Sequence, residues 1–162
     1  MIELERADDG LRVSGRVADP LEAIIARLLA TLGIELDNHH FRETPVRVAK
    51  FYREFTRGYA ARPADILKTF RSNSRELIVV SNIAFYSLCP HHLLIFGGRM
   101  HLGYVPDGLI AGISKIPRLV NALAARMVVQ EDLVADIADT FMEVSAMSAT
   151  RSSCTKIGRA HV

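Results

Sequence analysis

The sequence predicts an α+β domain in which an antiparallel sheet packs with helices on one of its faces. Apolar residues at helical spacing dominate the first 70 residues. Residues that are β-branched or aromatic gather between 76 and 113, and helical spacing returns from Ser114 onward. Helices, then strands, then helices is an order typical of α+β folds.

Three helices are predicted before the strands. The first covers 19–33, because Asp19 is an acidic N-cap, a proline follows it, and a glycine closes the segment. The second begins at a Thr-Pro pair and covers 44–58, and a short third helix covers 64–70. The first helix has an apolar stripe made of Leu21, Ile24, Ile25, Leu28, Leu29 and Leu32.

The middle of the chain is predicted to form strands. Segments 77–80 and 83–86 are rich in β-branched and aromatic residues. Segments 99–105 and 109–113 are predicted to pair as a hairpin, joined through the Pro-Asp-Gly turn at 106–108.

Two helices are predicted after the strands. Ser114 is expected to cap the first, where Pro117 is tolerated because first-turn amides lack intrahelical partners. The second follows Gln130. Their buried stripes are predicted to be Leu119, Val120, Leu123 and Met127 in the first helix, and Leu133, Val134, Ile137, Phe141 and Val144 in the second.

Composition and charge limit the classes of partner. The 162 residues are 49% hydrophobic and 23% charged, as in a one-domain globular protein. No apolar run approaches the roughly 20 residues of a membrane span, and the first residues include acids instead of a basic leader. The net charge is +2, but three cations lie in the acid-free segment 145–162, so the rest carries −1. We expect a cytoplasmic protein that binds neither membrane nor nucleic acid.

The segment Cys89-Pro90-His91-His92 is the most informative one. A Cys-x-x-His spacing lets one turn present a thiolate and an imidazole to the same Zn²⁺ ion. Catalytic zinc usually has three protein ligands, so this pair is part of a site. The alternative is a buried cysteine beside two loop histidines. The only other cysteine, Cys154, is distant, and two thiols do not suggest a disulfide framework.

A phosphate site is one interpretation of the start of the helix after Ser114. There Gly112-Ile113-Ser114-Lys115 combines free amides, a hydroxyl and a cation, and Arg118 lies one turn later. The alternative is a capped helix with solvated side chains. Arg47 and Lys50 share a face of the predicted helix 44–58 and are equally open to both interpretations.

A carboxylate begins the last helix. Glu131, which follows Gln130, can accept two hydrogen bonds from a planar N–H and NH₂ edge such as that of guanine. The alternative is an ordinary first-turn glutamate.

Five segments in this order resemble the GTP cyclohydrolase I family, and the likeness covers about Leu21 to Val144. The resemblance implies the tunnelling fold (T-fold), in which sheets of several subunits join into a barrel with helices outside. It also implies a homodecamer, and therefore a homo-oligomer, with active sites at subunit interfaces. The matching segments are 43–50, 85–94, 103–106, 113–116 and 129–131.

The resemblance also implies a reaction and a set of roles. The family uses zinc to open the purine ring of GTP hydrolytically at C8, releases formate, and forms 7,8-dihydroneopterin triphosphate, in the first step of tetrahydrofolate and pterin synthesis. Zinc lowers the pKa of bound water for such an attack. Cys89 and His92 match the zinc ligands, His91 the catalytic acid/base, Gln130 and Glu131 the guanine-binding pair, and Ser114, Lys115, Arg118, Arg47 and Lys50 the positions around ribose and triphosphate.

The chain also departs from the family pattern. We divide it into an N-terminal helical region, 1–74, an incomplete T-fold catalytic region, 75–144, and an atypical tail, 145–162. The family continues with a His-x-Cys segment, which holds the third zinc ligand, and an Arg-Gly pair, and the tail has neither. Cys154 therefore receives no ligand role. Because 157–162 resemble the translation of a sequencing adapter, we expect a C-terminally incomplete chain with weak zinc binding and little turnover.

Two other functions are compatible with the same residues. One is a non-catalytic truncated paralogue that binds nucleotide or joins oligomers of a complete partner. The other is the nitrile reductase of the T-fold, which needs a nucleophilic cysteine and NADPH. The Cys-x-His-His cluster favours zinc over that second enzyme.

Overall fold

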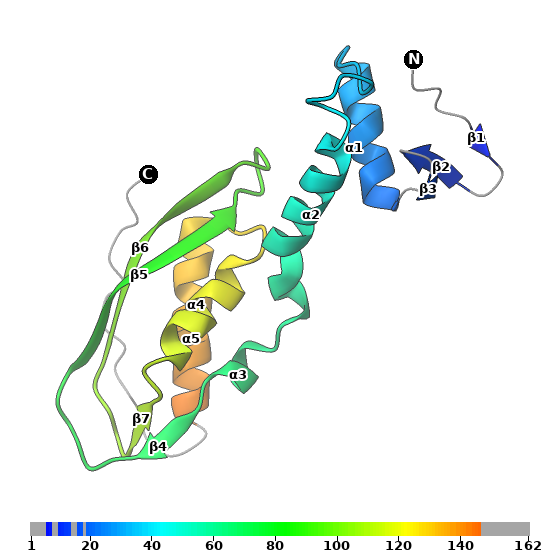
Figure 1. The fold of residues 1–162 in the computed structure, drawn as a ribbon. Coiled ribbons are helices and arrows are strands. Elements are labelled where there is room, and N and C mark those ends of the chain that lie inside the picture. The colour runs from blue at the N-terminus through cyan, green and yellow to red at the C-terminus, as the bar shows by residue number, and fades with distance from the viewer. Residues whose placement is uncertain (1–5, 8–9, 14–15, 18, 147–162) are drawn as a thin grey trace. The chain divides into compact units, whose positions relative to one another are not determined.

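The computed structural model describes residues 6–7, 10–13, 16–17 and 19–146 (Figure 1). The chain divides into two compact units, Met1–Glu54 and Phe55–Val162. The predicted division into regions 1–74, 75–144 and 145–162 stays a prediction. No helix in the described part is long and apolar enough to cross a membrane.

The N-terminal unit contains three short strands, one helix and all but the last two residues of a second helix. The strands β1 (Arg6–Ala7), β2 (Gly10–Val13) and β3 (Arg16–Val17) are antiparallel neighbours that the sequence patterns did not indicate. The helices α1 (Pro20–Thr31) and α2 (Thr44–Thr56) confirm the first two predicted helices, although α2 ends two residues early.

The predicted N-cap of α1 is confirmed. The backbone N–H of Leu21 donates to the Asp19 carboxylate at 2.9 Å. The guanidinium of Arg53, on α2, bonds to the same carboxylate and holds the pKa of Asp19 below its ordinary value. The apolar stripe of α1 is only partly covered: Ile25 is buried, whereas the side chains of Ile24, Leu28 and Leu32 are more than half exposed.

The second unit is the α+β part of the chain, with antiparallel strand pairs and helices as predicted. Its elements are the 3₁₀ helix η1 (Arg57–Ala60), α3 (Pro63–Ile66), β4 (Thr69–Arg71), β5 (Ile78–Leu88), β6 (Ile95–Tyr104), β7 (Leu109–Ala111), α4 (Lys115–Ala124) and α5 (Gln130–Ala146).

A long antiparallel hairpin, β5–β6, forms the main sheet, and both α4 and α5 lie on one side of it (Figure 1). Side chains alternate along β5, so that Ile83 and Phe85 are buried while Ala84 and Tyr86 are exposed. The hydrophobic core lies between this face and the helices. It includes Met100, Leu102 and Tyr104 of β6, Ile116, Leu119, Val120 and Leu123 of α4, and Leu133, Ile137 and Phe141 of α5.

The predicted hairpin between 99–105 and 109–113 is wrong. The strand β6 pairs with β5, with Phe85 opposite Gly98, and β7 pairs with β4. The Pro-Asp-Gly turn does form, with Gly108 at φ +80°. Pairing with the long β5 buries a far larger apolar face than a three-residue partner could, and long-range packing therefore outweighs the local turn signal.

Three local predictions also need correction. The short helix predicted over 64–70 ends at Ile66, and Phe70 lies in β4 instead. The two strands predicted over 77–80 and 83–86 are one strand with a register shift. At this bulge Asn82 adopts φ 63°, which an asparagine tolerates better than most residues.

The helix α4 begins directly after Ser114 as predicted, but the predicted side-chain cap and the predicted end of the helix are wrong. The Ser114 side chain makes no capping hydrogen bond. Its φ of −72° and ψ of −13° are helical, whereas a capping side chain normally needs an extended backbone. The helix ends at Ala124, and Met127 forms a bridge with Leu88 instead of continuing the buried stripe.

Candidate functional site

A tight turn between β5 and β6 holds the cysteine and histidines singled out by the sequence. The N–H of Cys89 donates to the Leu94 carbonyl at 2.8 Å, and the N–H of Leu93 donates to the Cys89 carbonyl at 2.9 Å. Leu93 has φ 56°, a left-handed conformation that costs a leucine about 1–2 kcal/mol. The turn joins β5 and β6, and these strands hold it in a conformation that brings one thiol and two imidazoles together.

The thiol of the turn lies close to each of its two imidazoles. The Sγ atom of Cys89 is 3.8 Å from Nδ1 of His92 and 3.9 Å from Nδ1 of His91. Zn–S and Zn–N bonds at a tetrahedral angle separate the two donor atoms by about 3.6 Å. The cysteine and an imidazole therefore fit a shared zinc ion. No group of three or more potential metal-ligating side chains occurs among the described residues, so this is a two-ligand pair.

The same contacts change the acidity of the thiol. Hydrogen bonding from the His92 side chain, and then from the backbone of His91 and His92, lowers the pKa of Cys89 from an ordinary 9.0 to about 7. Cys89 is half-buried, and both histidines are exposed. A thiol with this pKa supplies thiolate at neutral pH, which is the form that binds zinc and reacts with electrophiles.

We predict that Cys89 alkylation by iodoacetamide has a midpoint near pH 7 in the metal-free protein. The rate rises through that pH because thiolate replaces thiol as protons are lost. A Cys154→Ser background leaves Cys89 as the only thiol. Adding His92→Ala removes the largest stabilising contact and should move the midpoint toward 9.0. An unchanged midpoint in that variant would show that His92 does not stabilise the thiolate.

The loop between α4 and α5 lies against the strand that ends at this turn. The buried Ser87 hydroxyl donates to the Arg126 carbonyl at 3.0 Å. The N–H of Val128 donates to the Leu88 carbonyl at 3.2 Å, and Leu88 forms a parallel bridge with Met127. Gln130 follows two residues later, at the first position of α5. One chain therefore brings the Cys89 turn together with the segment that leads into the Gln130–Glu131 pair.

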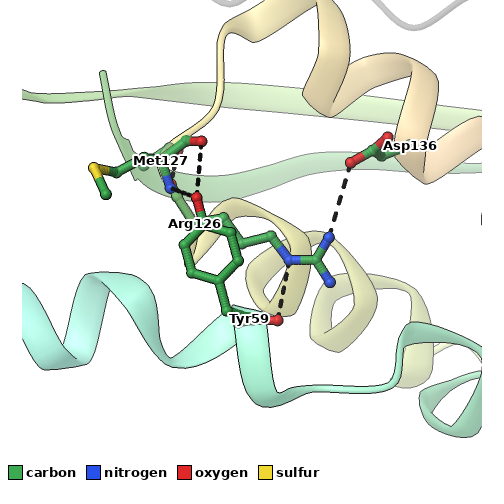
Figure 2. Close-up of polar contacts among 6 residues, drawn as sticks. Tyr59, Arg126, Met127 and Asp136 are labelled. Atoms are coloured by element: carbon green, nitrogen blue, oxygen red, sulfur yellow. Dashed lines mark hydrogen bonds and ion pairs between the residues drawn. The ribbon is translucent and has the colours of Figure 1, made fainter. Parts of the chain in front are cut away.

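The 3₁₀ helix η1 holds the other side of this loop, as Figure 2 shows. The Tyr59 hydroxyl donates to the Met127 carbonyl at 3.2 Å and accepts from the Met127 N–H at 3.3 Å. The Nε of Arg126 donates to the Gly58 carbonyl at 3.0 Å, and its guanidinium lies 3.9 Å from the Asp136 carboxylate. These contacts fix the backbone that precedes Gln130 and Glu131.

The predicted phosphate-binding residues lie at the opposite end of α4. Ser114 precedes the helix and Lys115 begins it, and the Lys115 N–H is already bonded to the Gly112 carbonyl at 2.8 Å. The helix α4 has ten residues and is therefore about 15 Å long. This length separates its first residue, Lys115, from its last turn, which leads to Met127. Within one chain, Ser114 and Lys115 are therefore not brought to the Cys89 turn.

The remaining site predictions are located as follows. Arg118 is exposed on α4, Glu131 is exposed and Gln130 half-buried at the start of α5. Arg47 and Lys50 are exposed on α2, in the N-terminal unit. The atypical tail predicted over 145–162, with Cys154, lies outside the described residues from position 147 onward.

Sequence reasoning missed the residues that fix the loop before Gln130. Tyr59, Arg126 and Ser87 were given no role, and Gly58 was interpreted only as a helix end. The contacts of these residues join segments between 39 and 68 positions apart. No local sequence pattern indicates such pairs.

Comparison with known proteins gives a consistent result. Residues 21–154 match the family model described as GTP cyclohydrolase I, which extends ten residues beyond the likeness recognised in the sequence. The GTP cyclohydrolase 1 of Janthinobacterium sp. (strain Marseille) is 49% identical over 120 residues, 72% of this chain and 61% of the relative. That of Thermobifida fusca (strain YX) is 41% identical over 139 residues, 84% of this chain and 67% of the relative. The chain thus spans about three fifths to two thirds of the length of these relatives.

Proposed function

Because this chain belongs to the GTP cyclohydrolase I family, we propose that it performs the hydrolytic ring opening of GTP. The purine ring is opened at C8 with zinc, formate is released, and 7,8-dihydroneopterin triphosphate is the product. One observation carries the proposal: Cys89, His91 and His92 converge on one turn inside the matched region. The loop leading to Gln130 lies against the strand end beside that turn.

Cys89 and His92 are the residues that would hold the zinc ion. Their donor atoms are 3.8 Å apart, and the lowered thiol pKa favours the thiolate that zinc requires. When bound, zinc would supply a Lewis acid that makes water a nucleophile near neutral pH. With two ligands among the described residues, we expect zinc to bind weakly and turnover to be slow.

His91 is the proposed acid/base group. Its imidazole lies beside Cys89, 3.9 Å from the sulfur, and His91 is exposed. An imidazole can take up and return a proton near neutral pH. We assign His91 the protonation of the imidazole-ring nitrogen that leaves C8 as the purine opens.

Gln130 and Glu131 are proposed to recognise guanine. Glu131 is exposed at the first turn of α5, where the amino end of the helix favours a negative charge. Its two carboxylate oxygens match the N1–H and 2-NH₂ donors of guanine. The half-buried Gln130 adds a donor and an acceptor on the same edge.

The triphosphate is proposed to bind between copies of this chain, in a T-fold homodecamer. Ser114, Lys115 and Arg118 are too far along α4 to meet the Cys89 turn of the same chain, so a second copy would supply them. The uncovered sheet face supports assembly, since it exposes Val79, Tyr86 and Ile95 by more than half. Sedimentation of a stable monomer at micromolar concentration would argue against this assembly.

The reaction is tested by incubating the chain with GTP and Zn²⁺ and measuring pterin absorbance and formate together. We expect slow formation of both products, dependent on zinc. His91→Ala should lower the rate by about 10²–10⁴-fold, the usual contribution of an acid/base group, while GTP affinity changes little. GTP binding without either product would instead favour a non-catalytic nucleotide-binding member of the family.

A further inference from the structure

The Tyr59 side chain is used in an unusual way. Its hydroxyl both donates to and accepts from the backbone of one residue, Met127, at 3.2 and 3.3 Å (Figure 2). The Tyr59 side chain is 60% exposed, so burial of the ring explains little of its position. Met127 lies outside both flanking helices, and this hydroxyl takes the place of a helical partner for its N–H and carbonyl groups.

The hydroxyl of Tyr59 adds two hydrogen bonds to the contacts with β5 and η1 that hold this loop. Val128 is held by Leu88 of β5, and Arg126 is held by Ser87 and by the Gly58 carbonyl. Met127 lies between these two anchors, three residues before Gln130. Because α5 begins after only two more residues, a change in the peptide orientation of Met127 would reach the first turn of α5 through Val128. The contact of Val128 with Leu88 keeps that effect small.

We infer that Tyr59 is a positioning residue for base recognition: its hydroxyl fixes Met127 and thereby orients Gln130 and Glu131 toward guanine. The inference rests on the proposed function, since it assumes that this pair recognises the base. Tyr59 itself makes no hydrogen bond to Gln130 or Glu131. It acts through the backbone that runs from Met127 to Gln130. Its effect should therefore be on selectivity for the base.

The test compares GTP with inosine triphosphate. Inosine triphosphate lacks the 2-amino group from which Glu131 is proposed to accept a hydrogen bond. Tyr59→Phe removes the hydroxyl and keeps the ring, and the contacts of Arg126 and Val128 remain to hold the loop. We expect the GTP affinity to fall about fivefold, within the range for loss of two exposed hydrogen bonds. The affinity for inosine triphosphate should fall by a smaller factor. The ratio of the affinities for GTP and inosine triphosphate should therefore decrease.

Tyr52→Phe is the matched control, because it makes the same change on α2, in the N-terminal unit, at a residue with no proposed role in base recognition or assembly. It should leave the preference for GTP unchanged. Zinc affinity, measured by competition with a chromophoric chelator, should be equal in the parent and in Tyr59→Phe.

The possible failures can be told apart. If the parent chain does not prefer GTP over inosine triphosphate, the proposed recognition of guanine by Gln130 and Glu131 is wrong. If the parent prefers GTP and Tyr59→Phe keeps the full preference, the role of Tyr59 is wrong while the proposed function stands. Equal weakening of both nucleotides would also overturn the role, because it would indicate general loosening of the fold.

Discussion

Replacing Gly58 with alanine is expected to lower the free energy of unfolding by about 3 kcal/mol. A Cβ atom at this position would lie 2.1 Å from the Ala122 carbonyl oxygen and 2.6 Å from that of Ala125. Both are backbone atoms of α4 and its end, so no side-chain rotation can relieve the overlap. The 3₁₀ helix η1 would have to move away from α4.

That movement would also break hydrogen bonds. The Gly58 N–H donates to the Ala125 carbonyl at 2.8 Å, and its own carbonyl accepts from Arg126 at 3.0 Å. The steric cost and the lost hydrogen bonds therefore act together, and the loop before α5 should loosen. Urea denaturation followed by circular dichroism measures the change as a lower midpoint.

Gly103→Ala is the matched control for this prediction. The nearest atoms to its added Cβ lie at 3.6 Å or more and belong to ordinary contacts of Leu77 and Val79. We expect a change within about 0.5 kcal/mol. Equal destabilisation by the two substitutions would contradict the close approach of η1 to α4.

The second large effect concerns zinc. Cys89→Ala should weaken Zn²⁺ binding by at least about 100-fold, because loss of a hydrogen-bonding partner behind a ligand already costs 10–100-fold and this change removes one of the two proposed ligands. The substitution should not unfold the chain, since Cys89 lies on a half-exposed turn whose closing hydrogen bonds are made by the backbone. Competition with a chromophoric chelator gives the affinity.

His92→Ala should lower the Zn²⁺ affinity by a similar factor. His40→Ala is the control, because it removes an imidazole outside the proposed site. His40 is exposed in the N-terminal unit beside His39, with the two rings 3.8 Å apart. It should leave zinc affinity within twofold of the parent. Retention of zinc by both Cys89→Ala and His92→Ala would place the metal elsewhere in the chain and remove the main support for the proposed chemistry.

The sequence predicted those parts of the molecule that local chemistry governs. The cap at Asp19 and the helical stripe of α5 depend on residues within a few positions of one another, and both are confirmed. The Cys89-Pro90-His91-His92 motif also lies within a single turn, and its thiol and imidazoles do converge. The family assignment followed from five such local segments in the right order, and the comparisons confirm it.

Only the tertiary structure decided which strands pair and which residues hold the loop before Gln130. The turn at 106–108 gave the correct local bend, but the partner of β6 was set by the apolar area that β5 could bury with it. Likewise, the hydrogen bonds of Gly58, Tyr59 and Arg126 join residues that are 67 or 68 positions apart in the sequence. Such contacts depend on distances that exist only after the core has formed, whereas sequence patterns record the preferences of neighbouring residues.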